Sequence, residues 1–381
     1  MMYNKILIFI DWFLPGYKAG GPIKSVNSII SELSVFFKFY VVTGDRDLGD
    51  ESSYKDVVLN NWIQKEKYNI IYLTKDKQTK KTYRKLIEEI KPNTIYFNSL
   101  FSYKFTILPL ITVKLYRKHS IKKIIAPRGM FGEGAMKIKY RKKVFFLYLC
   151  KLIGFFENVI WHASSDYEKK DIIENINANS IVKIAPNLSR KITEEWTYKE
   201  KKRGELNLFF LSRISKTKNL HYALKILQSI KEERINFYVI GTKEDVFYFN
   251  KCMNDVDKLT NNIKFYYLGE VENTKIHNII SKFHFLFLPT LHENFGHVIA
   301  ESLQAGCPVI ISDQTIWRDL EQKGVGWDIS LENEVKFIDV IKYCSKMTSE
   351  EYNNMSKEAF EYAKKSINSV EIIEQNRMVF E

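Results

Sequence analysis

The sequence has few cysteines, and none of them lie close together. Cys150, Cys252, Cys307 and Cys344 are scattered along the chain without a Cys-x-x-Cys pair. This spacing indicates neither a disulfide framework nor a cysteine zinc site. It is typical of a protein kept in a reducing compartment such as the cytoplasm.

Long hydrophobic runs are also absent. Near the N-terminus, residues 6–10 are the only continuous apolar stretch before Asp11, which is too short for the core of a signal peptide. The most apolar later run, residues 144–156, is interrupted by Lys151 and stays below the roughly 20 residues that cross a bilayer. We therefore expect no membrane-spanning segment and a cytoplasmic protein.

Acidic residues are scarce in the first half of the chain. Residues 1–190 hold 32 Lys and Arg against 17 Asp and Glu, whereas residues 191–381 hold 26 against 28. Residues 101–143 contain twelve basic residues and one acid, Glu133. This asymmetry favours an anionic partner for the first half, namely nucleic acid, anionic lipid or a phosphorylated acceptor, although a solvated basic surface would look the same.

Apolar strand-like runs alternate with helical patterns along the chain. Such alternation predicts parallel sheets with helices on both faces, and 381 residues suit two domains. We expect a first domain over 1–187, a polar linker over 188–204, a second domain over 205–355 and a helical tail over 356–381. The predicted strands are 5–10, 39–43, 69–73, 94–97, 123–126, 159–163, 181–185, 205–211, 237–240, 263–268, 283–288 and 309–311.

Residues 288–313 have the pattern of a strand, a loop, a helix and a second strand. Asn294 is expected to open the helix, which would continue to about Ala305. Glu293 and Glu301 are eight residues apart, so on a straight helix their carboxylates would be separated by about 12 Å on nearly the same side. The stretch could be only a capped helix with a solvated Glu301.

The start of this helix also predicts an anion site. Backbone amides near Phe295, Gly296 and His297 would lie at the helix N-terminus, where an anion is favoured. Two carboxylates flanking an anion site suit a ligand with hydroxyls at both ends and phosphates in the middle. A nucleotide sugar has this chemistry.

The same stretch resembles the Glu-x7-Glu signature of glycosyltransferase family 4, whose members are retaining GT-B glycosyltransferases. The residues that match in the family's order are Glu293, Phe295, Gly296, Glu301, Gly306, Pro308 and Val309. The resemblance implies a GT-B fold, in which two Rossmann-like, doubly wound parallel-sheet domains face a central cleft and the last helix crosses back to the first domain. It also implies that Glu293 holds the donor sugar and Glu301 the ribose.

Arg213 and Lys218 are five apart in a loop that enters a helix. Two cations at a helix N-terminus can clamp a diphosphate, although such a pair is common on surfaces. The pair resembles the Arg-x4-Lys pair of family 4. Gly241 and Gly269 end two strands at places where the family lines its nucleotide cleft.

In the first half, Gly20 and Gly21 follow the first strand and precede a helix that Pro22 can start. Glycines at such a turn let backbone amides approach a phosphate, but a lone Gly-Gly is most often a simple turn. In the family, a glycine-rich turn at this place faces the donor diphosphate, and many members have a histidine at the end of a later strand. This chain has Arg128 there, and we expect Arg128 to replace the histidine as a cation facing a donor or acceptor phosphate.

After Arg128, a basic and then apolar segment is predicted to be a helix. Lys137, Lys139, Arg141, Lys142 and Lys143 could contact lipid phosphates, while residues 145–148 pack inward or enter the interface. An ordinary amphipathic helix with a solvated basic face is the alternative. The Pro-Arg-Gly run before it resembles a subset of family 4 that builds bacterial surface polysaccharides.

Metal chemistry is not expected. His292 and His297 are five apart, about 140° around a helix, and cannot share a metal from one face as a zinc-protease pair does. Nor do we expect an Asp-x-Asp motif, which would indicate a metal-dependent GT-A glycosyltransferase. No cofactor is expected beyond the nucleotide-sugar donor.

Together these features predict a retaining, metal-independent glycosyltransferase. It would move a sugar to a glycan acceptor, lipid-linked, for a bacterial O-antigen, capsule or exopolysaccharide, and would be peripheral on the inner face of the membrane. Alternatives are an epimerase or a phosphorylase with the same fold, and a basic nucleic-acid-binding protein. The aromatics of residues 101–148 lie mostly in apolar helical patterns, which argues against a base-stacking surface.

Overall fold

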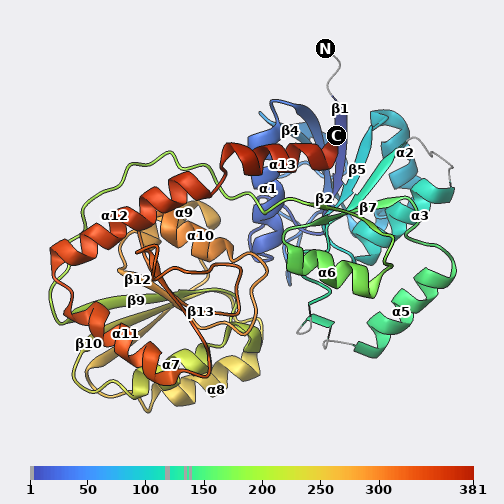
Figure 1. Ribbon diagram of the computed structural model, residues 1–381. Coiled ribbons are helices and arrows are strands. Elements are labelled where there is room, and N and C mark those ends of the chain that lie inside the picture. The colour runs from blue at the N-terminus through green and yellow to red at the C-terminus, as the bar shows by residue number, and fades with distance from the viewer. Residues whose placement is uncertain (1–3, 116–120, 133–134, 137–139) are drawn as a thin grey trace. The chain divides into compact units, whose positions relative to one another are not determined.

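The computed structural model describes residues 4–115, 121–132, 135–136 and 140–381. These residues form two compact units (Figure 1). The first unit comprises Met1–Arg190 and Val370–Glu381, and the second comprises Lys191–Ser369. Glu133, Gly134, Lys137 and Lys139, which belong to the predicted basic segment, lie outside the described residues.

The first unit contains an eight-stranded sheet with the order β3-β4-β2-β1-β5-β6-β7-β8. All neighbours are parallel, as predicted, except β3, an edge strand that was not predicted and that pairs antiparallel with β4. Its strands are β1 (Asn4–Phe9), β2 (Phe37–Gly44), β3 (Trp62–Gln64), β4 (Tyr68–Leu73), β5 (Thr94–Phe97), β6 (Lys122–Ile125), β7 (Val159–Ala163) and β8 (Ile181–Ile184).

Both faces of this sheet are buried. Leu7 and Phe9 of β1 belong to the core on one face, whereas Ile6 and Ile8 belong to the core on the other. Successive side chains of a strand alternate between faces, so a continuous apolar run is what a strand covered on both sides requires. The helices of the unit are α1 (Gly21–Leu33), α2 (Lys80–Ile90), α3 (Leu108–Leu115), α5 (Tyr140–Leu152), α6 (Asp166–Asn175) and α13 (Val370–Phe380), with short turns η1 (Lys75–Lys77) and η2 (Tyr103–Ile107).

The C-terminal helix α13 packs on the first unit. The Phe380 ring contacts those of Phe37, Phe39 and Tyr96, and the Asn376 side chain donates to the Pro186 carbonyl at 2.8 Å. The tail predicted to cross back was 356–381. In the structure α12 (Ser349–Ser366) belongs to the second unit, and only 370–381 belong to the first.

The second unit contains a six-stranded, all-parallel sheet with the order β11-β10-β9-β12-β13-β14. Its strands are β9 (Glu205–Leu211), β10 (Arg234–Ile240), β11 (Ile263–Gly269), β12 (Phe285–Leu288), β13 (Val309–Ser312) and β14 (Gly326–Ile329). Its helices are η3 (Lys216–Lys218), α7 (Leu220–Gln228), α8 (Val246–Val256), α9 (Asn273–Ile280), α10 (His297–Gln304), α11 (Glu334–Lys346) and α12.

The segment predicted as a linker, 188–204, lies largely against the second unit. The Trp196 indole donates to the Ser356 hydroxyl at 3.0 Å, and the Lys199 amide donates to the Asn353 side chain at 2.8 Å. The Lys201 ammonium is buried on two carbonyls, those of Ser345 and Met347. Polar residues without period are therefore held in place here, because they bond to side chains of α12 and to carbonyls at the end of α11.

Within the described residues, no helix is both long and apolar enough to cross a bilayer.

Candidate active site

In the second unit, two loops meet at the carboxyl ends of the neighbouring strands β9 and β12. The strand order continues to one side through β10 and to the other through β13, so this is the point where the order reverses. Ligands of open parallel sheets bind outside the strands at such a point. The β9 loop carries Arg213 and Lys218, and the β12 loop carries Glu293.

Hydrogen bonds join these two loops. The Leu291 amide donates to the Thr217 carbonyl at 2.8 Å, and the Thr290 hydroxyl donates to the same carbonyl at 3.0 Å. The Asn219 side chain donates to the Pro289 carbonyl at 3.0 Å. The loops therefore hold Lys218 and Glu293 in fixed positions relative to each other.

Lys218 and Glu293 form a direct ion pair. Their side chains are only 16% and 17% exposed, so the pair is shielded from bulk water. The structure thus brings together two residues that the sequence placed 75 positions apart. A lysine next to this carboxylate can bond a phosphate oxygen while the carboxylate accepts from a sugar hydroxyl.

Arg213 has a different partner. Its guanidinium forms a 2.6 Å ion pair with Glu244, which lies in the loop after β10, and both side chains are about two-fifths exposed. Arg213 and Lys218 are therefore each paired with their own carboxylate. A diphosphate clamp made by both would require Arg213 to exchange Glu244 for phosphate.

Helix α10 begins later than predicted. It spans His297–Gln304, and Gly296 precedes it with a left-handed φ of 77°. Glu293 therefore lies in the loop, and the straight-helix spacing of about 12 Å between the carboxylates does not apply. The reason is Gly296, because its positive φ turns the chain before the helix starts. Glu301 is half-buried within the helix.

Several predicted residues shape the turn that precedes α10. Phe295 is buried, and its carbonyl accepts from the Trp317 indole at 2.6 Å. A side chain at Gly296 would meet Ile299 at 2.8 Å and the Glu293 Cγ at 3.0 Å, so glycine there leaves room for Glu293. Asn294 and His297 are half-buried around this turn, and the His297 ring lies 4.8 Å from that of Phe295.

Gly241 ends β10 for a steric reason. Its φ is 142°, and a Cβ would lie 1.8 Å from the Ser212 carbonyl oxygen. Its amide donates to the Gly269 carbonyl at 2.7 Å. Gly241 therefore lets the loops after β9 and β10 approach each other, whereas a Cβ at Gly269 would have nothing within 4 Å.

The first unit has its own polar centre at the carboxyl ends of β5 and β6. Arg128 follows β6 with a left-handed φ of 56°. Its Nε donates to Asn98 at 2.8 Å, one terminal nitrogen donates to Tyr96 at 2.6 Å, and the other donates to Asn187. The Asn98 side chain also donates to the Pro22 carbonyl at 3.2 Å, so Arg128 is linked to the first turn of α1 beside Gly20 and Gly21.

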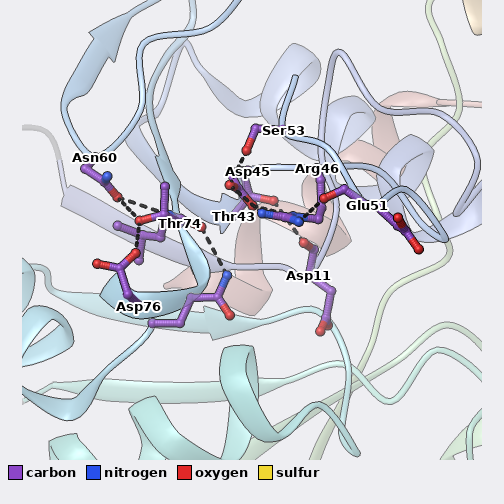
Figure 2. A network of polar contacts seen from close by, with 11 residues as sticks. Asp11, Thr43, Asp45, Arg46, Glu51, Ser53, Asn60, Thr74 and Asp76 are labelled. Carbon is purple, nitrogen blue, oxygen red and sulfur yellow. Dashed lines mark hydrogen bonds and ion pairs between the residues drawn. The ribbon is translucent and has the colours of Figure 1, made fainter. Parts of the chain in front are cut away.

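Asp45-Arg46-Asp47, directly after β2, has the Asp-x-Asp spacing, so the expectation that the chain lacks one is wrong. Figure 2 shows that Asp45 accepts from Arg46 and Ser53. Asp47 accepts from the backbone amides of Tyr17, Lys18 and Leu48. These bonds occupy the carboxylates. No group of three or more His, Cys, Asp and Glu in the described part of the chain is placed to hold a metal ion.

Figure 2 also shows Asp11, which follows β1 and was not predicted as a site residue. The Ser102 hydroxyl donates to its carboxylate at 2.6 Å, and the Thr43 hydroxyl donates to its carbonyl. Burial raises the pKa of Asp11 above its usual value, against the lowering effect of the Ser102 bond. Thr290, Trp317 and Glu244 were missed as well, since each acts through a contact with a residue distant in sequence.

A sheet of Rossmann type in each of two units is the arrangement of the GT-B fold. Residues 192–362 match the family model described as glycosyl transferases group 1. This match, which lies within the second unit, agrees with the predicted family. No protein of curated function matches the sequence significantly.

Solved structures with the GT-B fold resemble the whole chain. The sucrose-phosphate synthase of Thermosynechococcus elongatus has a TM-score of 0.71 at 12% identity and covers 100% of this chain and 98% of its own. HepE of Anabaena, in complex with UDP and glucose, has a TM-score of 0.70 at 13% identity, with 99% and 98% covered. WaaG, a glycosyltransferase involved in lipopolysaccharide biosynthesis, has a TM-score of 0.65 at 12% identity, with 98% and 99% covered. The predicted GT-B fold is thus confirmed.

Proposed function

We propose that the protein transfers a sugar from a nucleotide-diphosphate sugar to a glycan acceptor, with retention of configuration and without a metal ion. The observation that carries this proposal is the shielded Lys218–Glu293 pair at the switch point between β9 and β12. It is supported by the group 1 family match and by the GT-B neighbour HepE, which has been crystallised with UDP-glucose.

The proposed chemistry breaks the bond between the sugar and the diphosphate while an acceptor hydroxyl arrives on the same face. Negative charge then develops on the leaving diphosphate. Lys218, Arg213 and the first-turn amides of α10 stabilise this charge as it forms. Glu293 holds the sugar, Glu301 the ribose, and the leaving phosphate takes the proton of the acceptor. In the first unit, Arg128 and the turn at 20–21 are the groups proposed to meet phosphate.

The test begins with the thermal stability of the purified protein in the presence of UDP, ADP, GDP and their sugar conjugates. A ligand that binds the native state raises the melting temperature by mass action. The stabilising donor is then incubated with and without a glycan acceptor, and the anomeric configuration of the product is read by NMR. Conversion of the donor without acceptor would identify an epimerase instead, and inversion would refute the retaining mechanism.

We further propose that α5 binds an anionic membrane. Leu147 and Cys150 pack inward, while Phe145, Tyr148, Leu149 and Leu152 are exposed in a stripe on the opposite side. Of the residues predicted to pack inward or enter the interface, Leu147 therefore packs inward, whereas Phe145 and Tyr148 are exposed.

The basic face of α5 also differs from the prediction. The Lys143 ammonium donates to the Ala135 carbonyl at 2.7 Å and lies 4.9 Å from the Phe101 ring centre, so it is turned inward. Arg141, Lys142 and Lys151 are exposed beside the apolar stripe. Cations next to exposed aromatics are the features of an interfacial helix.

Flotation with vesicles tests this surface. We expect binding to vesicles containing phosphatidylglycerol, weaker binding to pure phosphatidylcholine, and loss of binding in high salt. The double substitution Phe145→Ser and Tyr148→Ser should abolish it. Phe36→Ser and Tyr103→Ser, which replace two other exposed aromatics of the same unit, are the matched control. Equal binding to both lipids would contradict the proposal.

A further inference from the structure

Arg128 is a cation held entirely by neutral groups. Its three acceptors are the side-chain oxygens of Asn98, Asn187 and Tyr96, and among the described residues no carboxylate pairs with it. The charge of Glu168 acts on Tyr96, but its oxygens accept from the Gly129 amide at 2.6 Å and from the Ser164 amide and hydroxyl at 2.8 and 2.7 Å. The guanidinium is thus fixed in direction while keeping its charge.

The direction of every hydrogen bond in this network can be assigned. Arginine only donates, so the oxygen of each asparagine side chain must face it. The Nε2 of His162 lies 3.0 Å from the Ala185 carbonyl, which can only accept, so Nε2 carries the proton. The Nδ1 of His162 therefore accepts from the Tyr96 hydroxyl at 2.9 Å, and the Tyr96 oxygen accepts from Arg128.

The environment keeps His162 neutral. Burial, and next the charge of Arg128, lower its pKa to about 3. Burial likewise raises the pKa of Tyr96 to about 12. Neither His162 nor Tyr96 titrates near neutral pH, so these two side chains contribute no negative charge next to Arg128.

A half-buried cation without a counter-charge is costly unless an anion completes it. Arg128 lies next to the switch point of the first sheet, where β1 and β5 are neighbours and the order runs to β2 on one side and β6 on the other. The planar guanidinium suits phosphate oxygens better than any other side chain does. Asn98 links Arg128 to the first turn of α1, whose backbone amides also favour an anion.

We propose that Arg128 is the centre of a diphosphate-binding site on the first unit and that Asn187 determines its specificity by being neutral. Tyr96 and His162 are positioning residues that aim the guanidinium. This inference rests on the proposed function, because the diphosphate group comes from the substrates proposed there, either the nucleotide donor or an isoprenoid-linked acceptor.

The substitution Asn187→Asp isolates charge from structure. It keeps the shape of the side chain and the oxygen that Arg128 contacts, but it neutralises the guanidinium with an ion pair. Within the described part of the chain, the Asn187 side chain bonds Arg128 through its oxygen and not through its amide nitrogen, so the change keeps this contact. A purely structural Arg128 would tolerate this substitution or be stabilised by it. A diphosphate site would lose its affinity.

The matched control is Asn93→Asp. Asn93 precedes β5 at the opposite edge of the same sheet, where its side chain accepts from the Lys5 amide at 2.8 Å. Asn93→Asp adds the same single negative charge to the first unit as Asn187→Asp does. Calorimetric titration of the full-length chain with UDP, geranyl diphosphate and inorganic pyrophosphate then shows whether the bound diphosphate belongs to the nucleotide donor or to an isoprenoid-linked acceptor.

We expect Asn187→Asp to weaken pyrophosphate binding by about tenfold or more, together with either UDP or geranyl diphosphate, while its melting temperature stays the same or rises. Loss with UDP assigns the site to the donor, and loss with geranyl diphosphate assigns it to the acceptor. Affinities equal to those of Asn93→Asp would overturn the inference while leaving the proposed function intact. If the native protein bound none of the three, this inference would fail, whereas the proposed function, which leaves the base of the donor open, would not.

Two further variants keep the proposal testable if Asn187→Asp does not fold. Asn98→Asp places the same charge on another acceptor of Arg128 and applies if Asn187→Asp does not fold. Tyr96→Phe removes one aiming bond but keeps the charge, so we expect a several-fold loss of pyrophosphate affinity with a small change in melting temperature. A lower melting temperature with unchanged affinity would show that Tyr96 is only structural.

Discussion

In the second unit, Lys218 and Arg213 each face a carboxylate, whereas in the first unit Arg128 faces only neutral oxygens. The second unit, Lys191–Ser369, is electrically balanced, with 25 basic and 25 acidic residues, whereas the first half of the chain is strongly basic, with 32 against 17 over residues 1–190. The two sheets thus differ near their switch points, because the cations of the second unit are paired with carboxylates and Arg128 of the first unit is bonded only to neutral oxygens.

This difference has a consequence for binding. An anion that enters the second site must compete with Glu293 and Glu244 for the two cations. An anion that enters the first site displaces no carboxylate, because Arg128 is already oriented by hydrogen bonds and has no carboxylate partner among the described residues. Pre-organised charge of this kind loses little energy to rearrangement.

The largest expected effect is on the balanced pair. Glu293→Gln keeps the shape of the side chain but leaves Lys218 without its counter-charge and removes the sugar's acceptor. We expect kcat/KM for transfer to fall about 1,000-fold, roughly 4 kcal/mol of transition-state stabilisation. The measurement is initial-rate kinetics with the stabilising donor. Glu88→Gln, which removes the carboxylate of the exposed Arg84–Glu88 pair, is the control and should leave the rate unchanged. An unchanged rate in Glu293→Gln would remove the pair from the mechanism.

The sheets could largely be predicted from the sequence. The predicted strands 94–97, 159–163 and 205–211 match β5, β7 and β9 to the residue, because apolar runs buried on both faces leave a strong pattern. Strands β3 and β14 were missed. Strand β3 is a short antiparallel edge strand with half-exposed residues. Strand β14 starts at Gly326, where a Cβ would lie 2.1 Å from the Val309 carbonyl oxygen.

The partners within the candidate site could not be predicted in the same way. Motif spacing named Lys218 and Glu293 but not their direct contact, and it placed Glu293 on a helix that starts only at His297. Glu244, Asn187 and Tyr96 carry no motif, and each matters through one bond to a distant residue. Such contacts depend on how loops meet at a sheet edge, which local periodicity does not encode.

The second-largest effect contrasts glycines in the two units. Gly241→Ala places a methyl group 1.8 Å from the Ser212 carbonyl, between two strand ends that cannot separate without losing pairing. We expect a loss of about 3 kcal/mol in the free energy of unfolding. Gly20→Ala has a similarly unfavourable φ of 67° but nothing within 4 Å, so about 1–2 kcal/mol is expected. Urea denaturation measures both, and equal losses would contradict the steric explanation.

A smaller effect compares the buried histidines of the two units under acid. Burial lowers the pKa of His162 to about 3 and that of His284 to about 4, against 6.5 in an unfolded chain. Below pH 6.5 the unfolded state binds protons that the native state does not. The free energy of unfolding therefore decreases as the pH is lowered, by up to roughly 1.4 kcal/mol per pH unit for each group.

Urea midpoints at pH 7.5, 6 and 5 measure this dependence. His162→Gln and His284→Gln should each be less stable than the native protein at pH 7.5, and the difference should shrink as the pH falls. Both variants should converge by a similar amount over this range, since both native pKa values lie below pH 5. Parallel pH curves for variant and native protein would show that the histidine is not the titrating group.

The smallest expected effect concerns Glu244, which competes with the ligand for Arg213. Both side chains are about two-fifths exposed, so the pair contributes less than about 1 kcal/mol to stability. Arg213→Ala should weaken UDP binding by about tenfold, because a bond to phosphate is lost. Glu244→Gln should instead strengthen it about two- to threefold, since Arg213 no longer has to leave a carboxylate. Calorimetric titration with UDP measures both. If Glu244→Gln weakened binding, the carboxylate would be orienting Arg213 rather than screening it, and the second unit would then pre-aim its cation just as the first unit does.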